Sequence, residues 1–184
     1  MTQALYLIRH TTPRIAPGIC YGQIDIGLAD SFREEADSVL HYLPPLELIL
    51  ASPLQRARRL AEHLAQTRHC ELRSDGRLME KHFGAWEGNA WDNIARNEID
   101  AWAADIMGYA PPGGESAQQL MRRVQALLSD IAQLPQRSIA LVAHGGSIKA
   151  MLAQIGDMPL ADTLSWEIGY GGVIGVRNLE RASI

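Results

Sequence analysis

Arginine and histidine side chains follow three separate apolar segments of this chain. Arg9 and His10 end the first segment, Arg56 lies just beyond the second, and His144 follows the third, directly before two glycines. A guanidinium group presents a planar fork of hydrogen-bond donors that suits oxyanions. Each feature alone is compatible with a structural role, but its repetition after three apolar segments predicts a local anion-binding site.

The apolar segments that carry these residues are short and continuous, which is typical of buried strands in a parallel sheet. They span Ala4–Arg9, Glu47–Ala51 and Ser138–Ala143. In such sheets ligands bind beyond the carboxyl ends of the strands, where the following helices add partial positive charge and free N–H donors. We therefore expect the cationic residues to meet at one edge of the sheet.

Helical and turn signals fill the chain between these strands. We expect helices at 30–43, from Ser52 to about 66, at 90–106, at 116–134 and from 145 to 155. Ser52 would be the N-cap of the second helix and Pro53 its first residue. We also expect a strand and a turn near Cys70 and Leu78, a loop at 109–115, and closing strands at 163–168 and 172–176. This alternation predicts an α/β three-layer sandwich with a mostly parallel central sheet and helices on both faces.

Bulk composition sets the broad class of protein. The chain has 184 residues, 47% of them apolar and 21% charged, with a net charge of −4, so we expect one domain over residues 1–184. The negative balance argues against nucleic acid or an anionic membrane surface as a partner. Cys20 and Cys70 form no CxxC motif, which favours a reducing, cytoplasmic setting. We expect no metal and no other cofactor, and the oligomeric state stays open, with a homodimer among the alternatives.

Five short motifs, in order along nearly the whole chain, resemble the histidine phosphatase superfamily, the relatives of cofactor-dependent phosphoglycerate mutase. The motifs are LIRH at 7–10, ASPLQRA at 51–57, EKHFGAWEG at 80–88, PGGES at 112–116 and VAHGG at 142–146. The chain length, the Tyr21-Gly22 pair and the PPGGES loop are most similar to the alpha-ribazole phosphatase branch. That branch removes phosphate from a cobalamin precursor.

The resemblance implies catalytic roles for five residues. His10 would be the nucleophile that becomes phosphorylated, Glu80 the general acid, and Arg9, Arg56 and His144 the groups that hold the phosphoryl oxygens. Elementary chemistry agrees, because a neutral imidazole can attack phosphorus and flanking arginines disfavour its imidazolium form. Preplaced cations also stabilise the charge that spreads over the phosphoryl oxygens.

Three positions depart from the family pattern. Thr11 stands where glycine is usual, so its side chain would either crowd the pocket or donate a hydrogen bond to phosphate. Ala16 stands where asparagine is often found near the phosphate, which leaves the second wall of the pocket open. His82 replaces an acidic residue of the alpha-ribazole branch and would either contact the leaving group or pack at the surface. Gly145, which opens the helix after His144, is expected to bind phosphate together with Thr11.

Substrate contacts are expected from Tyr21, Gly22, His82, Glu115 and Ser116. The PPGGES loop resembles a segment that lies over the pocket in small phosphatases of the family. Glu115 and Ser116 would therefore touch substrate, begin the next helix as capping residues, or do both.

The expected function is a metal-independent phosphomonoesterase that acts through a phosphohistidine on a small phosphorylated metabolite, with alpha-ribazole 5′-phosphate as the first candidate. A phosphoglycerate mutase or a broad-specificity sugar phosphatase is one alternative, although mutases of the family carry longer insertions between the acid segment and the second histidine. A non-catalytic phosphate-binding protein on the same scaffold is another. Trp86 and Trp91 would either stack on a heterocycle of the substrate or belong to the core.

Overall fold

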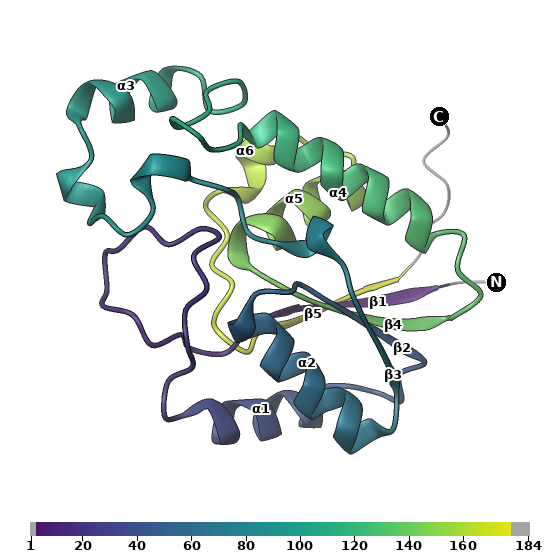
Figure 1. Cartoon of the computed structure of the whole chain (residues 1–184). Coiled ribbons are helices and arrows are strands. Elements are labelled where there is room, and N and C mark those ends of the chain that lie inside the picture. Colours follow the sequence, from purple (N-terminus) through teal and green to yellow (C-terminus); the bar gives the residue numbers. More distant parts are fainter. Residues whose placement is uncertain (1–2, 178–184) are drawn as a thin grey trace.

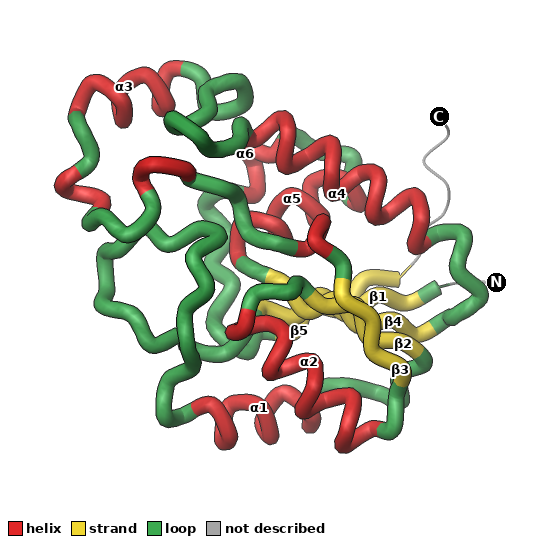
Figure 2. Tube along the Cα trace, in the orientation of Figure 1, coloured by secondary structure: helices red, strands yellow, loops and turns green. Residues whose placement is uncertain are grey.

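A five-stranded sheet forms the centre of the structure, a computed structural model that describes residues 3–177 (Figures 1 and 2). In spatial order the strands are β3 (Glu71–Ser74), β2 (Leu48–Ala51), β4 (Ser138–Ala143), β1 (Ala4–Arg9) and β5 (Val173–Arg177). The first four run parallel, and β5 pairs antiparallel with β1. Arg9 is in register with Ala143, and Ala51 with Val142. The strands β1, β4 and β2 therefore end at nearly the same level.

Helices cover both faces of this sheet, so the chain folds as an α/β three-layer sandwich (Figure 1). One face carries α1 (Phe32–His41) and α2 (Gln55–Arg68), and the other carries α4 (Ala117–Ile131), α5 (Gly145–Ile155) and the short α6 (Leu160–Thr163). A further helix, α3 (Arg96–Ala104), lies outside these layers together with the 3-10 turns at Gly84–Trp86 and Trp91–Asn93 (Figure 1). A third 3-10 turn, Gly76–Leu78, follows β3.

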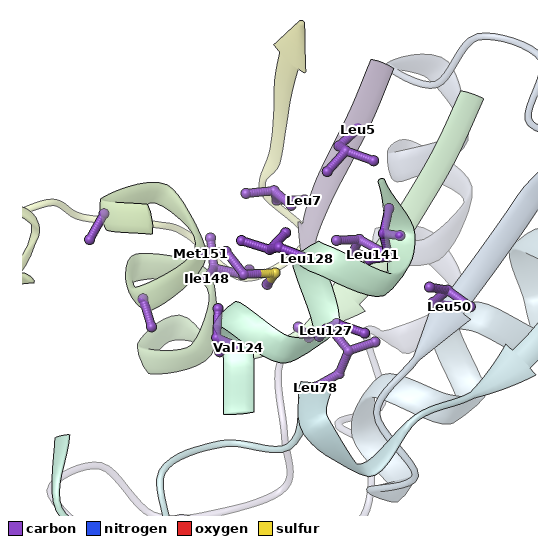
Figure 3. Close-up of a cluster of buried hydrophobic side chains, with 14 of the residues drawn as sticks. Leu5, Leu7, Leu50, Leu78, Val124, Leu127, Leu128, Leu141, Ile148 and Met151 are labelled. Atoms are coloured by element: carbon purple, nitrogen blue, oxygen red, sulfur yellow. The ribbon is translucent and has the colours of Figure 1, made fainter. Parts of the chain in front are cut away.

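The core on the α4 and α5 face follows directly from helical periodicity. Leu120, Val124, Leu127 and Ile131 recur at three- and four-residue steps along α4, and each is nearly or fully buried. They pack with strand residues such as Leu141 and with side chains of α5 in one hydrophobic cluster (Figure 3). This packing fixes the start of α5 against the end of β4.

The structure confirms most of the expected elements. The strands at Ala4–Arg9 and Ser138–Ala143 have the predicted bounds, and the helix at Gly145–Ile155 does too. Two expectations are wrong in detail. The segment 90–106 is not one helix, because Ile94 and Ala95 have extended backbone angles between a 3-10 turn and α3. Helix α2 begins at Gln55, so Ser52 and Pro53 precede it.

The expected strand at 163–168 is also wrong. Leu160–Thr163 is a single helical turn after Pro159, and the Thr163 hydroxyl donates a hydrogen bond to the Leu160 carbonyl at 2.8 Å. The chain then crosses to the end of β1, where the Ile168 carbonyl accepts a hydrogen bond from Arg9. The local apolar pattern predicts a strand here, but the segment instead contacts the sheet edge through the Ile168 carbonyl.

The capping of α4 generates a stability prediction. The Ser116 hydroxyl accepts a hydrogen bond from the Gln119 N–H at 3.2 Å, and the Gln119 side chain accepts one from the Ser116 N–H at 2.7 Å. Loss of such a cap costs about 1 kcal/mol, so Ser116→Ala should lower the free energy of unfolding by roughly that amount in urea titrations. Ser129→Ala, at an exposed position of the same helix, is the control. Equal losses in the two variants would contradict the capping assignment.

Candidate active site

The carboxyl ends of β1, β2 and β4 bring the predicted residues together. His10 follows β1 and His144 follows β4, and their ring centroids are 5.0 Å apart. Ser52 follows β2, and its hydroxyl lies 2.8 Å from Nε2 of His144. The parallel register thus places two imidazoles at one sheet edge, as the sequence predicts.

His10 is held as a neutral imidazole with one defined tautomer. Its Nδ1 lies 2.7 Å from the Thr11 carbonyl oxygen, which can only accept, so Nδ1 carries the proton and Nε2 keeps its lone pair. Burial lowers the pKa of His10 from 6.5 to about 3, and the positive charges of Arg56 and Arg9 act in the same direction. An unprotonated Nε2 at neutral pH is what a nucleophile requires.

His144 is equally buried. Its pKa lies well below the ordinary value, because of burial first and then because a second cation is unfavourable beside the His10 ring and the nearby arginines. When the Ser52 hydroxyl donates to Nε2 of His144, the ring proton sits on Nδ1, which has no protein partner. Nδ1 is then a free donor at the same sheet edge.

Arg56 and Arg9 are fixed at the site from two directions. Arg56, in the first turn of α2, is fully buried and donates to the carbonyls of Gly22 and Ile24 at 2.6 and 2.8 Å. Arg9 donates to the Ile168 carbonyl, and its guanidinium carbon lies 4.0 Å from the ring centroid of Tyr170. These contacts fix both guanidinium groups by their terminal nitrogens.

Several buried polar atoms at this edge have no protein partner. Within residues 3–177, six buried side-chain polar atoms lack a hydrogen bond, and four of them belong to predicted phosphate-binding residues. These four atoms are Nε of Arg9, Nε of Arg56, Nδ1 of His144 and Oγ1 of Thr11. Buried polar groups in folded proteins are nearly always hydrogen-bonded. A cluster of unpaired donors therefore fits an oxyanion ligand.

Glu80 lies at the N-terminus of α5. Its carboxylate accepts hydrogen bonds from the Gly146 N–H at 2.9 Å and the Ser147 N–H at 3.2 Å. A Cβ atom at Gly146 would come within 2.3 Å of Oε1 of Glu80, so only glycine permits this approach. Glu80 also lines one cavity of about 930 Å³ together with Arg9 and Gly145. The carboxylate is thus oriented beside the anion donors.

Tyr21 and Gly22 support the arginines. The ring centroid of Tyr21 is 5.1 Å from the guanidinium carbon of Arg56, and its hydroxyl lies 3.1 Å from that of Tyr170. Burial, with the Tyr170 hydrogen bond, raises the pKa of Tyr21 to about 12. Gly22 has a φ of +29°, and its carbonyl holds Arg56. Substrate contact by these two residues stays a prediction.

The other predicted substrate residues have structural contacts and do not line the cavity. Glu115 forms an ion pair with Arg123 at 2.6 Å and accepts a hydrogen bond from the His82 N–H at 2.9 Å. Ser116 is the N-cap of α4, which is one of the two roles expected for it. The His82 ring is half-exposed, with Nε2 4.0 Å from a Glu87 oxygen. The structure therefore gives these three residues a supporting position, and their direct contact with substrate stays a prediction.

Sequence reasoning missed three residues of the site. Tyr170 covers Arg9, and its ring centroid lies 5.5 Å from that of His10. The sequence predicts a helix cap at Ser52, although this residue directly follows a strand that ends at the same sheet edge. Arg123 donates to the carbonyls of Arg77, Met79 and Glu80 from α4. Nothing in the local sequence around Tyr170 or Arg123 signals these contacts.

Trp86 and Trp91 were expected either to stack on a substrate heterocycle or to belong to the core, and the structure agrees with packing inside the protein. Trp86 is nearly buried and packs with Trp91 and Trp102 in an aromatic cluster. Neither Trp86 nor Trp91 lines the cavity, whereas Trp102 does.

In the part of the chain that the structure describes, no group of three His, Cys, Asp or Glu side chains could hold a metal ion. No helix of the same part is long and apolar enough to cross a membrane.

The buried histidines generate a prediction for stability against pH. In the unfolded chain His10 regains a pKa near 6.5, whereas in the folded chain it stays neutral down to about pH 3. Below pH 6.5 the unfolded state therefore binds more protons, and stability falls by about 1.4 kcal/mol per pH unit for each such histidine. His10→Ala should lose stability less steeply than the wild type in urea unfolding between pH 7 and 5.

A substitution that removes no titratable group provides the control for this measurement. Ser129→Ala, at an exposed position of α4, should keep the wild-type dependence on pH. Identical slopes for His10→Ala and the wild type would mean that His10 is not held neutral in the folded chain.

Comparisons with known proteins agree with this geometry. A family model, the histidine phosphatase superfamily (branch 1), matches residues 5–181. The chain is 32% identical to a probable phosphoglycerate mutase from Salmonella choleraesuis over 163 residues, covering 84% of this chain and 75% of that protein. It is 33% identical to a glucosyl-3-phosphoglycerate phosphatase from Mycobacterium tuberculosis over 161 residues, covering 77% of this chain and 69% of the relative.

A solved structure supports the same fold. The alpha-ribazole phosphatase from Shigella flexneri superposes with a TM-score of 0.86 over 94% of this chain and 89% of its own, at 23% identity. At that identity the likeness concerns the fold alone. The family match and the phosphatase relative together identify the enzyme class as a phosphoric monoester hydrolase. The chain belongs to the histidine phosphatase superfamily, branch 1.

Proposed function

We propose that this protein hydrolyses phosphate monoesters of small metabolites without a metal ion, through a phosphohistidine at His10. The observation that carries this proposal is the group of unpaired buried polar atoms on Arg9, Thr11, Arg56 and His144 beside a neutral His10. Arginine and imidazole donors of this kind stabilise the negative charge of a phosphoryl group in transfer. They supply the charge that a metal ion provides in other phosphatases.

The first step transfers the phosphoryl group to His10. Nε2 of His10 forms a bond to phosphorus while the bond from phosphorus to the ester oxygen breaks. Glu80, which carries a proton when the ester binds, gives it to the departing alkoxide and becomes the carboxylate held by the N–H groups of Gly146 and Ser147. Gly145, at the start of α5, adds a backbone N–H close to Arg9 for the phosphoryl oxygens.

The second step returns His10 to its free form. The Glu80 carboxylate takes a proton from a water molecule, whose oxygen attacks phosphorus as the bond to Nε2 breaks. Inorganic phosphate leaves, and both Glu80 and the neutral imidazole are restored. Such acid–base assistance typically contributes about 10²–10⁴-fold in rate.

We propose alpha-ribazole 5′-phosphate as the first substrate to test, on the likeness of chain length and PPGGES loop to that branch. The likeness to the probable phosphoglycerate mutase and to the glucosyl-3-phosphoglycerate phosphatase keeps a mutase and a sugar phosphatase as alternatives. The short interval between Glu80 and His144 favours hydrolysis over the mutase reaction.

We also propose a cytoplasmic location. Cys20 and Cys70 form no disulfide among the described residues, which agrees with a reducing compartment.

The experiment that tests this proposal measures phosphate release with EDTA present. We expect the wild type to hydrolyse p-nitrophenyl phosphate and alpha-ribazole 5′-phosphate, and His10→Ala to hydrolyse neither. A rapidly quenched reaction should contain an acid-labile phosphohistidine in the wild type. Binding of phosphate or vanadate without turnover of any ester would instead support the non-catalytic alternative, and inhibition by EDTA would contradict a metal-free mechanism.

Glu80 generates a separate prediction about leaving groups. Glu80→Gln should slow alkyl phosphates by about 10²-fold or more because their alkoxides need a proton. It should slow p-nitrophenyl phosphate far less, since nitrophenolate departs unprotonated. The measurement is kcat/KM for both esters, with His41→Ala as a control of unrelated position. Equal slowing of both esters would assign Glu80 a structural rather than an acid role.

A further inference from the structure

The cavity beside the phosphate donors is much larger than a phosphate group needs. Its volume is about 930 Å³, and its lining includes Arg9, Glu80 and Gly145, which together are called the phosphate end below. Ligand pockets generally measure about 300–1,000 Å³ and enclose most of their ligand. The space beyond the phosphate end must therefore be considered as a site for the rest of the substrate.

Two segments outside the sheet build most of the far wall. Helix α3 and the turn after it contribute Ile99, Trp102 and Ile106. Helix α6 and the loop after it contribute Leu160, Leu164 and Trp166. Figure 1 shows α3 standing apart from the sheet while α6 lies beside α4 and α5. The wall is thus formed by large apolar side chains from segments distant in sequence.

More than half of the exposed large hydrophobic side chains among the described residues gather at the same cavity. Seven large hydrophobic residues among those described are exposed, and four of them, Ile106, Leu164, Trp166 and Tyr170, line it. Exposed apolar side chains that gather in one place mark binding sites, whereas single ones carry no such meaning. Because Arg9 and Gly145 line this cavity and are also predicted to bind phosphate, we infer that its occupant is part of the same ligand.

The charged side chains of this wall are few, and both of its lysines are already engaged. Nζ of Lys149 donates to the Leu164 carbonyl at 2.7 Å. Nζ of Lys81 lies over the rings of Phe83 and Trp102, 5.2 and 5.3 Å from their centroids. Apart from the phosphate end, Glu167 is the other charged residue on the lining. A polyhydroxylated sugar would leave most of its hydroxyl groups facing hydrocarbon, which is unfavourable.

We propose that this cavity is a leaving-group subsite for a large, mostly apolar, ring-bearing alcohol. The proposal rests on the phosphomonoesterase function proposed above and names its substrate class. The phosphate would lie between Arg9, Arg56 and His144, and the ring system would lie against Trp102, Leu164 and Ile106. Small polar esters, such as those of glycerol or glyceric acid, would fill only the phosphate end.

Pairs of esters with matched chemistry test this proposal. Phenyl and 2-naphthyl phosphate release phenolates of similar basicity, so a difference in kcat/KM reports burial of the second ring. Burial of that ring should favour 2-naphthyl phosphate by roughly tenfold or more. For alkyl esters, 2-phenylethyl phosphate should exceed glycerol 1-phosphate by a similar ratio.

Two rim variants and a neighbouring control locate the effect. Leu164→Asn and Ile106→Asn replace side chains that are 41% and 37% exposed, so neither opens the core. Both should reduce the ratio of naphthyl to phenyl turnover severalfold. Met107→Asn is the control, because Met107 is next to Ile106 and 41% exposed but does not line the cavity. It should keep the wild-type ratio and the wild-type rate with phenyl phosphate.

The outcomes separate this inference from the proposed function. If the wild type hydrolysed none of the four esters, the phosphomonoesterase function itself would be overturned. Hydrolysis of phenyl and 2-naphthyl phosphate at equal efficiency, or a preference for glycerol 1-phosphate, would overturn only the apolar subsite. The apolar subsite would also be overturned if both rim variants kept the wild-type ratio of naphthyl to phenyl turnover. If the same variants lost a dimer that light scattering detects in the wild type, a second copy of the chain would cover these side chains instead.

Discussion

The burial of one cation, Arg56, governs the arrangement around the site. Arg56 is fully buried at the start of α2, and an uncompensated charge there would be very costly. The carbonyls of Gly22 and Ile24 provide that compensation, so the long segment between β1 and α1 must fold over the sheet edge. Glu87 then fixes this segment to the acid segment, because its carboxylate accepts the N–H groups of Gln23, Ile24 and Phe83. A single buried guanidinium thus links the phosphate end, the segment after β1 and the region that carries Glu80.

The position of Glu80 depends on a second buried arrangement. Arg123 of α4 donates hydrogen bonds to the carbonyl groups of Arg77, Met79 and Glu80, and Glu115 neutralises its charge. The N-terminus of α5 holds the carboxylate itself through two N–H groups, at a distance that excludes a side chain on Gly146. The backbone and the carboxylate of the proposed acid are therefore fixed by different helices. This explains why the PPGGES loop contributes to the site although Glu115 and Ser116 do not line the cavity.

The residues proposed to bind phosphate and those proposed to bind the leaving group belong to different parts of the fold. The donors proposed for phosphate come from strand ends and adjoining helix starts, where parallel pairing fixes their spacing. The apolar wall comes from α3, α6 and the loops beside them, which lie outside the paired strands. Loops and short helices can change without disturbing the ladder of the sheet. Relatives that keep the donors can therefore differ in the ester that they accept.

The sequence by itself determined the parallel strands, the amphipathic helices and the convergence of Arg9, His10, Arg56 and His144. Each of these depends on local periodicity and on the rule that parallel strands end at one edge. The tertiary structure alone decided that residues 163–168 form no strand, that Ser52 faces His144, and that Tyr170 covers Arg9. It also decided that Trp102, rather than Trp86 or Trp91, lines the cavity. These features depend on contacts between segments far apart in the chain. A sequence pattern reports only the residues next to one another, so it does not contain these contacts.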